Sequence, residues 1–290
     1  MRLMDGVRLA VGTLSVFPVR VERVDRQVAG QAMVLAPAVG LVLGLLAGLP
    51  LLLPAPPLLG AALAVGLLAL LTRGLHLDGL ADLVDGLGSG KPADQALDIM
   101  KKSDIGPFGV MTLVFTLLVQ VAAVAEAGYW ALVTACVAGR LTLAWACREG
   151  VPAARSEGLG AMVAGTVRRP AAWLATLAAS LTAVLIGLLA GAWSGVPGDV
   201  SWSPGLVPAG TDVYGMVRTY PTEAEFLVRD VVLWLSGPAG APLALLAGTG
   251  VALLLLRHAR RRLGGITGDV LGALVETATA ATLVIWALLP

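Results

Sequence analysis

Charged residues are scarce in this sequence. Only 13% of its 290 residues are Asp, Glu, Lys or Arg, whereas about a quarter of an ordinary soluble domain is charged. Hydrophobic residues make up 57% of the chain, so we do not expect a water-soluble fold. The net charge of +1 gives no strongly basic surface, so we expect no nucleic-acid partner.

Cysteine is nearly absent as well. Cys136 and Cys147 lie eleven residues apart in one apolar stretch, which is too far along a single helix for a disulfide bridge. We therefore expect two small packing residues.

The N-terminus lacks the order of a cleaved signal peptide, because Arg20, Arg23 and Arg26 follow its apolar part. We expect this segment to be retained.

Apolar segments long enough to cross a bilayer recur along the chain. A crossing helix needs about 20 mostly apolar residues, and such stretches occupy residues 31–53, 57–75, 107–127, 130–147, 170–193, 237–256 and 270–289. We therefore expect an all-α fold, a polytopic transmembrane helical bundle of about seven spans within a range of six to eight. It would form a single domain over residues 1–290, with residues 1–30 as an interfacial N-terminal segment.

Lys and Arg residues are distributed unevenly around these spans. If the N-terminus is cytoplasmic, seventeen of the twenty lie on the cytoplasmic side, Arg218 and Arg229 lie on the other side, and Arg140 falls inside a span. Positively charged residues favour the cytoplasmic side, and one span more or fewer in the middle would destroy the asymmetry. We therefore expect a cytoplasmic N-terminus, a cytoplasmic loop at 73–106 and an extracytoplasmic loop at 194–229.

The most informative segment reads R-G-L-H-L-D-G-L-A-D-L-V-D-G-L-G over residues 73–88. In a helix, Asp78, Asp82 and Asp85 would lie on one face, with neighbours about 5–6 Å apart. Like charges at this spacing repel, so we expect a compensating cation. Oxygen ligands without a thiolate or a histidine cluster suit Mg²⁺ or Mn²⁺ better than Zn²⁺.

Glycines interleave with these acids. Gly79, Gly86 and Gly88 remove side chains beside the carboxylates, which would let a bulky phosphate approach the backbone. An alternative interpretation is that the three acids are solvated loop residues.

A second polar string, D-I-M-K-K-S-D-I-G-P-F-G, occupies residues 98–109 before the third predicted span. Lys101 and Lys102 beside Ser103 could hold a diphosphate, while Asp104 adds a metal ligand or orients a lysine. The alternative is a topology anchor followed by a helix start.

A third string, R-H-A-R-R-R-L-G-G-I-T-G-D, runs over residues 257–269 into the final span. Thr267 and its neighbouring glycines suit close approach of a phosphate. Asp269 and Glu276 share a helix face, and an ionisable group as deep as Glu276 costs about 2.5–3.5 kcal/mol to insert, which makes it a functional candidate. Two alternatives stay open: Glu276 could pair with Arg140 between helices, and the arginines could be a topology signal alone.

All three strings fall on the predicted cytoplasmic side, so we expect a single site at that membrane surface. Arg155, between the fourth and fifth spans, lies on the same side and could add an arginine to a phosphate site. His76 could be a base, a ligand, or polar packing at a helix end.

These strings resemble the cobalamin synthase family, the adenosylcobinamide-GDP ribazoletransferases. The resemblance is carried by residues 76–86, 99–109 and 264–276, whose order and spacing extend over nearly the whole chain. It implies the joining of adenosylcobinamide-GDP to α-ribazole or its 5′-phosphate with release of GMP, late in cobalamin biosynthesis. It also implies a multi-pass protein of the bacterial inner (plasma) membrane.

The resemblance further implies Mg²⁺ as cofactor and assigns expected roles to residues. The expected metal ligands are Asp78, Asp82, Asp85, Asp104 and Asp269. The expected catalytic residues are Asp78, Asp82, Asp85, Glu276 and His76. The expected substrate contacts are Lys101, Lys102, Ser103, Arg140, Arg155 and Thr267. The expected partners are the lipid bilayer and, as a possibility, a second copy of the chain (a homo-oligomer) or other biosynthetic enzymes.

Two other functions fit parts of the pattern. A transferase with a CDP-alcohol or prenyl-diphosphate donor also lines a membrane cavity with spaced aspartates, so only the substrate would distinguish it. An ion-coupled transporter would explain Glu276 and Arg140. It would not explain why the acids gather at one membrane face, since transporter sites usually lie near the midplane.

Overall fold

The computed structural model describes residues 2–194 and 239–289, and the regular structure of these residues is helical. The helices are α1 (Arg2–Leu14), α2 (Arg26–Ala47), η1 (Leu49–Leu52), α3 (Pro57–Leu71), α4 (Leu75–Gly88), α5 (Ala93–Ile99), α6 (Pro107–Ala146), α7 (Gly158–Val163), α8 (Arg169–Ser194), α10 (Gly240–Leu263) and α11 (Gly268–Leu288). The expected all-α fold is confirmed. Apart from its first residue, the predicted outer loop at 194–229 lies outside the described residues.

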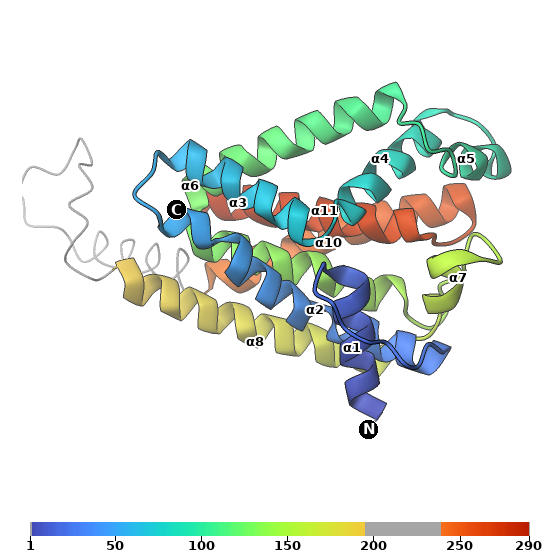
Figure 1. The fold of residues 1–290 in the computed structure, drawn as a ribbon, viewed down its shortest axis with the longest axis horizontal. Helices are drawn as coiled ribbons and strands as arrows, with labels where there is room; N and C mark the ends of the chain where they lie inside the picture. Colours follow the sequence, from blue (N-terminus) through green and yellow to red (C-terminus); the bar gives the residue numbers. More distant parts are fainter. Residues whose placement is uncertain (1, 195–238, 290) are drawn as a thin grey trace, which may run out of the picture.

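Long apolar helices run side by side along the long axis of the molecule, and short helices gather at one end (Figure 1). α11 lies inside the bundle, where it packs against α6, α10 and α4. Its residues from Val270 to Glu276 are all buried. α4, α5 and α7 lie at the end of the bundle away from the C-terminus, so the acidic motif of α4 is at one end of the molecule.

The outer surface of the bundle is apolar. On α8, Leu174, Leu177, Leu181, Leu185 and Leu188 are all exposed, and they recur every three or four residues along one helix face. Such a stripe on the outside of a bundle suits contact with lipid. Together with the long apolar helices, it supports a multi-pass membrane protein.

α6 is a helical hairpin. Its 40 residues would measure about 60 Å as one straight helix, roughly twice the hydrocarbon thickness of a bilayer. Gly128 interrupts it with φ 75° and ψ −163°. Gln120 is hydrogen-bonded to Glu276, and Gly139 packs against Thr279, so both halves of α6 lie against the same part of α11. The chain therefore reverses at Gly128, as Figure 1 shows.

The hairpin decides the number of spans. Among the described residues, α2 with η1, α6, α8, α10 and α11 are long and apolar enough to cross a membrane, and the bent pair α3–α4 makes a sixth candidate. Because α6 contains two crossings, the number becomes six, or seven if the bent pair α3–α4 is one span, which lies within the predicted range of six to eight.

The pair α3–α4 is bent by 88°. Arg73 and Gly74 make the bend, because their φ angles of 56° and 66° lie in the left-handed region, where a right-handed helix cannot continue. The Arg73 guanidinium also donates hydrogen bonds to the carbonyls of Gly12 and Ser15 at the end of α1. α3 runs along the bundle, whereas α4 turns aside at the bend and lies across the end of the bundle.

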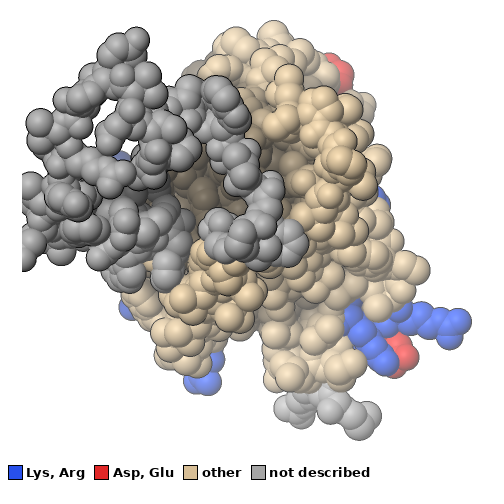
Figure 2. Space-filling model, turned by 90° about the vertical axis from the view of Figure 1, so that its left-hand side faces the viewer, with Lys and Arg blue, Asp and Glu red and all other residues tan. Residues whose placement is uncertain are grey.

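Among the described residues, charged side chains are few on the surface at the end of the bundle opposite α4. Figure 2 looks onto that end, and its described surface is mostly uncharged, with the visible Lys, Arg, Asp and Glu side chains lying at the edges. This is the asymmetry expected from the uneven distribution of Lys and Arg in the sequence.

The turn at Gly128 gives a test of the hairpin. Gly128→Ala places a Cβ on a residue whose φ and ψ only glycine adopts readily, so it should destabilise the protein by about 1–3 kcal/mol. We expect a lower midpoint of thermal unfolding for the detergent-solubilised protein. Gly250→Ala in α10, where a Cβ meets no atom within 4 Å, is the control and should keep or raise the midpoint. Equal midpoints for the two variants would contradict the hairpin turn.

Candidate active site

The acidic motif of α4 lies against the start of α11 because two glycines let these helices cross closely. A Cβ on Gly79 would lie 2.9 Å from the carbonyl oxygen of Asp269, and a Cβ on Gly272 would lie 3.1 Å from the carbonyl oxygen of His76. Larger side chains do not fit at these two positions. The crossing therefore joins two of the predicted strings, which come from opposite ends of the chain.

A cavity of about 300 Å³ opens beside this crossing. Residues of α1, α2, α4, α6, α7 and α11 line it, and its charged lining residues are Asp78, Arg155, Glu157 and Asp269. Its volume is at the lower end of the range for small-molecule sites.

Three of the predicted carboxylates come together here. Asp78 and Asp269 line the cavity, and the half-buried Asp82 lies one turn further along α4. Burial and the negative charges of Asp78, Asp269 and Asp85 raise the pKa of Asp82 to about 6, while Arg155 partly opposes the rise. The repulsion expected from the sequence is thus present in the folded protein, and a bound cation would relieve it.

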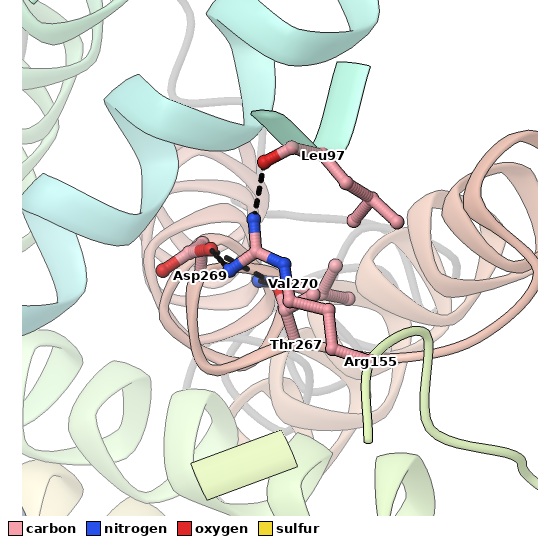
Figure 3. Close-up of polar contacts among 5 residues, drawn as sticks. All are labelled: Leu97, Arg155, Thr267, Asp269 and Val270. Carbon is pink, nitrogen blue, oxygen red and sulfur yellow. Dashed lines mark hydrogen bonds and ion pairs between the residues drawn. The ribbon is translucent and has the colours of Figure 1, made fainter. Parts of the chain in front are cut away.

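Arg155 provides the positive charge of the site. Its Nη2 donates a hydrogen bond of 2.5 Å to the carbonyl oxygen of Leu97, and its Nη1 lies 3.8 Å from Oδ2 of Asp269 (Figure 3). The loop that carries it is held by a hydrogen bond of 2.9 Å from the Ala154 N–H to the Ile266 carbonyl. Within the described part of the chain, the buried Nε of Arg155 has no hydrogen-bond partner, so the guanidinium still has a free donor.

Thr267 holds the start of α11. Its hydroxyl oxygen accepts a hydrogen bond of 3.2 Å from the Val270 N–H, as expected for a helix N-cap, and the hydroxyl donates to Oδ2 of Asp269 at 3.1 Å. These contacts, drawn in Figure 3, fix the Asp269 carboxylate at the cavity wall. Thr267 also lines the cavity, so its predicted contact with substrate stays a prediction.

Asp85 is buried and faces the start of α6. Its Oδ2 accepts a hydrogen bond of 2.7 Å from the Gly106 N–H, and its Oδ1 accepts one of 2.9 Å from the Gly109 N–H. These groups belong to the N-terminal donors that a helix leaves unsatisfied. The structure thus places Asp85 as a cap of α6, outside the cavity lining, and its role as a metal ligand stays a prediction.

The second predicted string does not line the cavity. Lys101, Lys102, Ser103 and Asp104 are all exposed in the segment between α5 and α6, and the cavity lining includes none of them. Contact with these residues would require a substrate that extends beyond the cavity.

Glu276 and Arg140 lie deeper in the bundle. Glu276 accepts a hydrogen bond of 2.8 Å from Nε2 of Gln120 and borders a separate cavity of about 420 Å³. Arg140 is 1% exposed, and its Nη1 donates to the carbonyl of Cys136 at 3.5 Å. None of the ion pairs found among the described residues joins Glu276 to Arg140, so they make no direct contact, but the Arg140 charge acts on Glu276 from a distance. Their catalytic and substrate-binding roles stay predictions.

The predicted role of the α4 glycines stays open at one position only. Gly86 packs against Met100 and Gly88 packs against the Phe108 ring, so protein atoms occupy the space that a phosphate was expected to use, and the prediction is wrong for these two residues. Gly79 packs against the backbone of Asp269 on one side but also lines the cavity, so approach of a phosphate at this residue stays a prediction. Gly268, which lines the cavity and has only Leu159 within 4 Å of an added Cβ, does keep open space.

The carboxylates of the site offer oxygen ligands for a metal ion but do not form a closed site. In the two described parts of the chain, no three His, Cys, Asp or Glu side chains already stand close enough to hold an ion. Asp78, Asp82 and Asp269 nevertheless provide the oxygen ligands that Mg²⁺ prefers, and Mg²⁺ usually keeps several of its waters. Their shared negative charge fits a divalent cation.

Some contributors were missed from the sequence. Thr13 of α1 and Met33 of α2 line the cavity, although residues 1–30, which include Thr13, were expected to be only interfacial. Gln120 is the partner of Glu276, and its amide within a predicted span is the signal that could have identified it. No periodicity in the sequence could have placed α1 beside the cavity.

Comparisons with known proteins give the chain a context. Residues 6–287 match the model of a family described as cobalamin-5-phosphate synthase. The chain is 41% identical to an adenosylcobinamide-GDP ribazoletransferase of Frankia casuarinae, with 99% of this chain and 95% of that protein covered. It is 37% identical to a protein of the same name from a Nocardioides species, over 98% of this chain and 99% of the relative. No solved structure matches the chain.

The position of Asp85 gives a test that separates a cap from a metal ligand. Asp85→Asn removes the charge and one of the two acceptor oxygens from the start of α6, so it should lower stability by about 1–3 kcal/mol. Thermal unfolding without added metal measures this loss. Asp82→Asn is the matched control: it accepts no hydrogen bond from a described residue and should melt at or above the wild-type midpoint. An Asp85→Asn protein that melts like wild type would refute the cap.

Proposed function

The chain belongs to the cobalamin-5-phosphate synthase family, and from this membership we propose that it transfers the adenosylcobinamide phosphate group of adenosylcobinamide-GDP to α-ribazole or its 5′-phosphate. GMP is released, and the reaction belongs to the last stage of cobalamin biosynthesis. The observation that carries the proposal is the meeting of Asp78, Asp82 and Asp269 with Arg155 beside one cavity. Carboxylates beside an arginine are suited to phosphoryl transfer.

Mg²⁺ is the proposed cofactor. Asp78, Asp82 and Asp269 would hold it, because they are the carboxylates gathered at the crossing of α4 and α11. When bound, Mg²⁺ would neutralise charge on the phosphate oxygens during transfer. Arg155, which already lies beside Asp269, would contact the same phosphates through its free donor.

The chemistry at the cavity is a displacement at phosphorus. A ribose hydroxyl of the acceptor forms a new bond to the phosphorus atom on the cobinamide side, and the bond from that phosphorus to the bridging oxygen breaks, so that the oxygen leaves with GMP. The hydroxyl proton passes to a carboxylate. Asp78 is the proposed base, because it is exposed and lines the cavity, whereas Glu276 borders a different cavity.

The proposed location is the inner membrane of a bacterium, with the site on the cytoplasmic face. Support comes from the distribution of Lys and Arg and from the number of spans, which, at seven, places the N-terminus and the C-terminus on opposite sides. Nucleotide substrates are available in the cytoplasm, which agrees with this orientation.

The activity is tested with detergent-purified protein, adenosylcobinamide-GDP, α-ribazole 5′-phosphate and Mg²⁺, and GMP release is the readout. We expect release by the wild type, and at least a 100-fold slower rate, about 2.7 kcal/mol, for Asp82→Asn and after removal of divalent metal. The loss follows because the phosphate charge is no longer neutralised. A folded wild type that releases no GMP would refute the assignment and make a lipid-linked diphosphate the next donor to test.

The orientation is tested by chemical labelling of introduced cysteines. Ser103 and Glu126 are both exposed, and the native Cys136 and Cys147 are buried. In intact spheroplasts, a membrane-impermeant maleimide should label Glu126→Cys, at the hairpin turn of α6, and should label Ser103→Cys only after lysis. The reverse pattern would invert the proposed topology.

A further inference from the structure

The cavity beside α4 changes character along its depth. Near its opening, Asp78 and Glu157 are exposed. At its inner end, Leu14, Met33, Leu143 and Leu271 line the wall, and none of them is more than 5% exposed. A ligand that matches this gradient has a polar, charged part at the opening and an apolar part inside.

His76 is the polar exception at the inner end. It lines the cavity and is only 3% exposed, yet neither ring nitrogen has a hydrogen-bond partner among the described residues. Its backbone is held in place by Gly272, whose added Cβ would lie 3.2 Å from the His76 Cα. Buried polar groups are nearly always hydrogen-bonded, and leaving one unpaired costs about 1–3 kcal/mol. The imidazole therefore lacks a partner that a ligand in the cavity can provide.

The size of the cavity limits which substrate it can hold. A volume of about 300 Å³ suits a nucleoside-sized ligand, whereas a corrin ring with its side chains and adenosyl group is several times larger. The base of α-ribazole is a substituted benzimidazole, which is a flat apolar ring system with one unsubstituted nitrogen that accepts a hydrogen bond. This base combines the apolar surface and the acceptor that the inner end lacks.

Building on the proposed function, we infer that this cavity is the acceptor site, in which the aromatic base of α-ribazole lies at the inner end and His76 donates a hydrogen bond to its unsubstituted ring nitrogen. The corrinoid donor then stays outside the cavity and presents its phosphates at the opening. A neutral imidazole has one N–H donor for this contact. His76 is a specificity-determining residue in this arrangement and takes no part in bond breaking.

The position of His76 on α4 agrees with the proposed chemistry. His76 precedes Asp78 by two residues, a spacing at which helical side chains point to different sides, yet both residues line the cavity, so one nucleoside that fills it can contact both. With its base against His76, the ribose lies toward Asp78 and Asp269 at the charged end. The acceptor hydroxyl would thus reach the carboxylates without any rearrangement of α4.

The inference is tested by changing one atom of the ligand and one residue of the protein. The ligand pair is α-ribazole and the corresponding indole riboside, in which a C–H group replaces the acceptor nitrogen. The protein set is wild type, His76→Leu, His76→Asn as the conservative variant, and His258→Leu. His258 is the other histidine of the chain and is exposed on α10, so this last variant is the matched control.

Two readouts are compared for each ligand: kcat/KM from GMP release, and Kd from equilibrium dialysis without donor. Wild type and His258→Leu should prefer α-ribazole over the indole riboside by about 10-fold or more. His76→Leu should bind the two ligands within about 2-fold of each other, through loss of affinity for α-ribazole alone, and His76→Asn should retain part of the preference.

Either of two results overturns the inference: wild type does not distinguish the ligands, or His76→Leu keeps the full preference. If wild type releases no GMP, the proposed function fails, and the dialysis still decides the inference.

If His76→Leu does not fold, Met33→Phe is the variant that tests the inference, because the larger side chain narrows the inner end of the cavity. It should raise KM for α-ribazole by about 10-fold and leave KM for adenosylcobinamide-GDP unchanged, and an equal rise in both KM values would overturn the acceptor site.

Discussion

The close crossing of α4 and α11 is the constraint on which the rest of the site depends. Gly79 and Gly272 leave no room for a Cβ on either helix, so the two backbones meet and bring Asp78, Asp82 and Asp269 together. In a membrane, helices gain little from burying apolar surface against one another, and small residues that permit close contact become the main source of packing. The same feature that stabilises the helix pair therefore also assembles its carboxylates.

A cluster of carboxylates at the end of a membrane bundle is costly unless other groups fix and neutralise it. Arg155 approaches Asp269, and the Thr267 hydroxyl donates to the same carboxylate. Asp85 acts at the other end of α4, where it satisfies two backbone N–H groups of α6. α4 is thus held at one end by α11 and at the other by α6. These contacts fix the orientation of the short helix and therefore of its carboxylates.

The polar residues within the bundle divide into two groups with different partners. Glu276 of α11 accepts a hydrogen bond from Gln120 in the first half of α6, which stabilises the contact between these two helices. His76 instead lies at the inner end of the cavity without a partner. An ion-coupled transporter would place its buried acid on the pathway near the midplane, whereas here the acids that share a cavity with Arg155 lie at one end of the bundle, and family membership supports a transferase.

The sequence by itself determined the helical class, about seven apolar segments and the three strings that carry the acids. Bilayer thickness sets the length of an apolar segment, and helical periodicity sets the spacing of residues that share a face. It also indicated that Asp78, Asp82 and Asp269 belong together. Only the tertiary structure decided that Asp85 caps α6, that Glu276 meets Gln120 instead of Arg140, that Gly79 packs against a helix, and that α1 borders the cavity. These contacts join residues distant in sequence, and their partners depend on how helices rotate and cross, which no local pattern specifies.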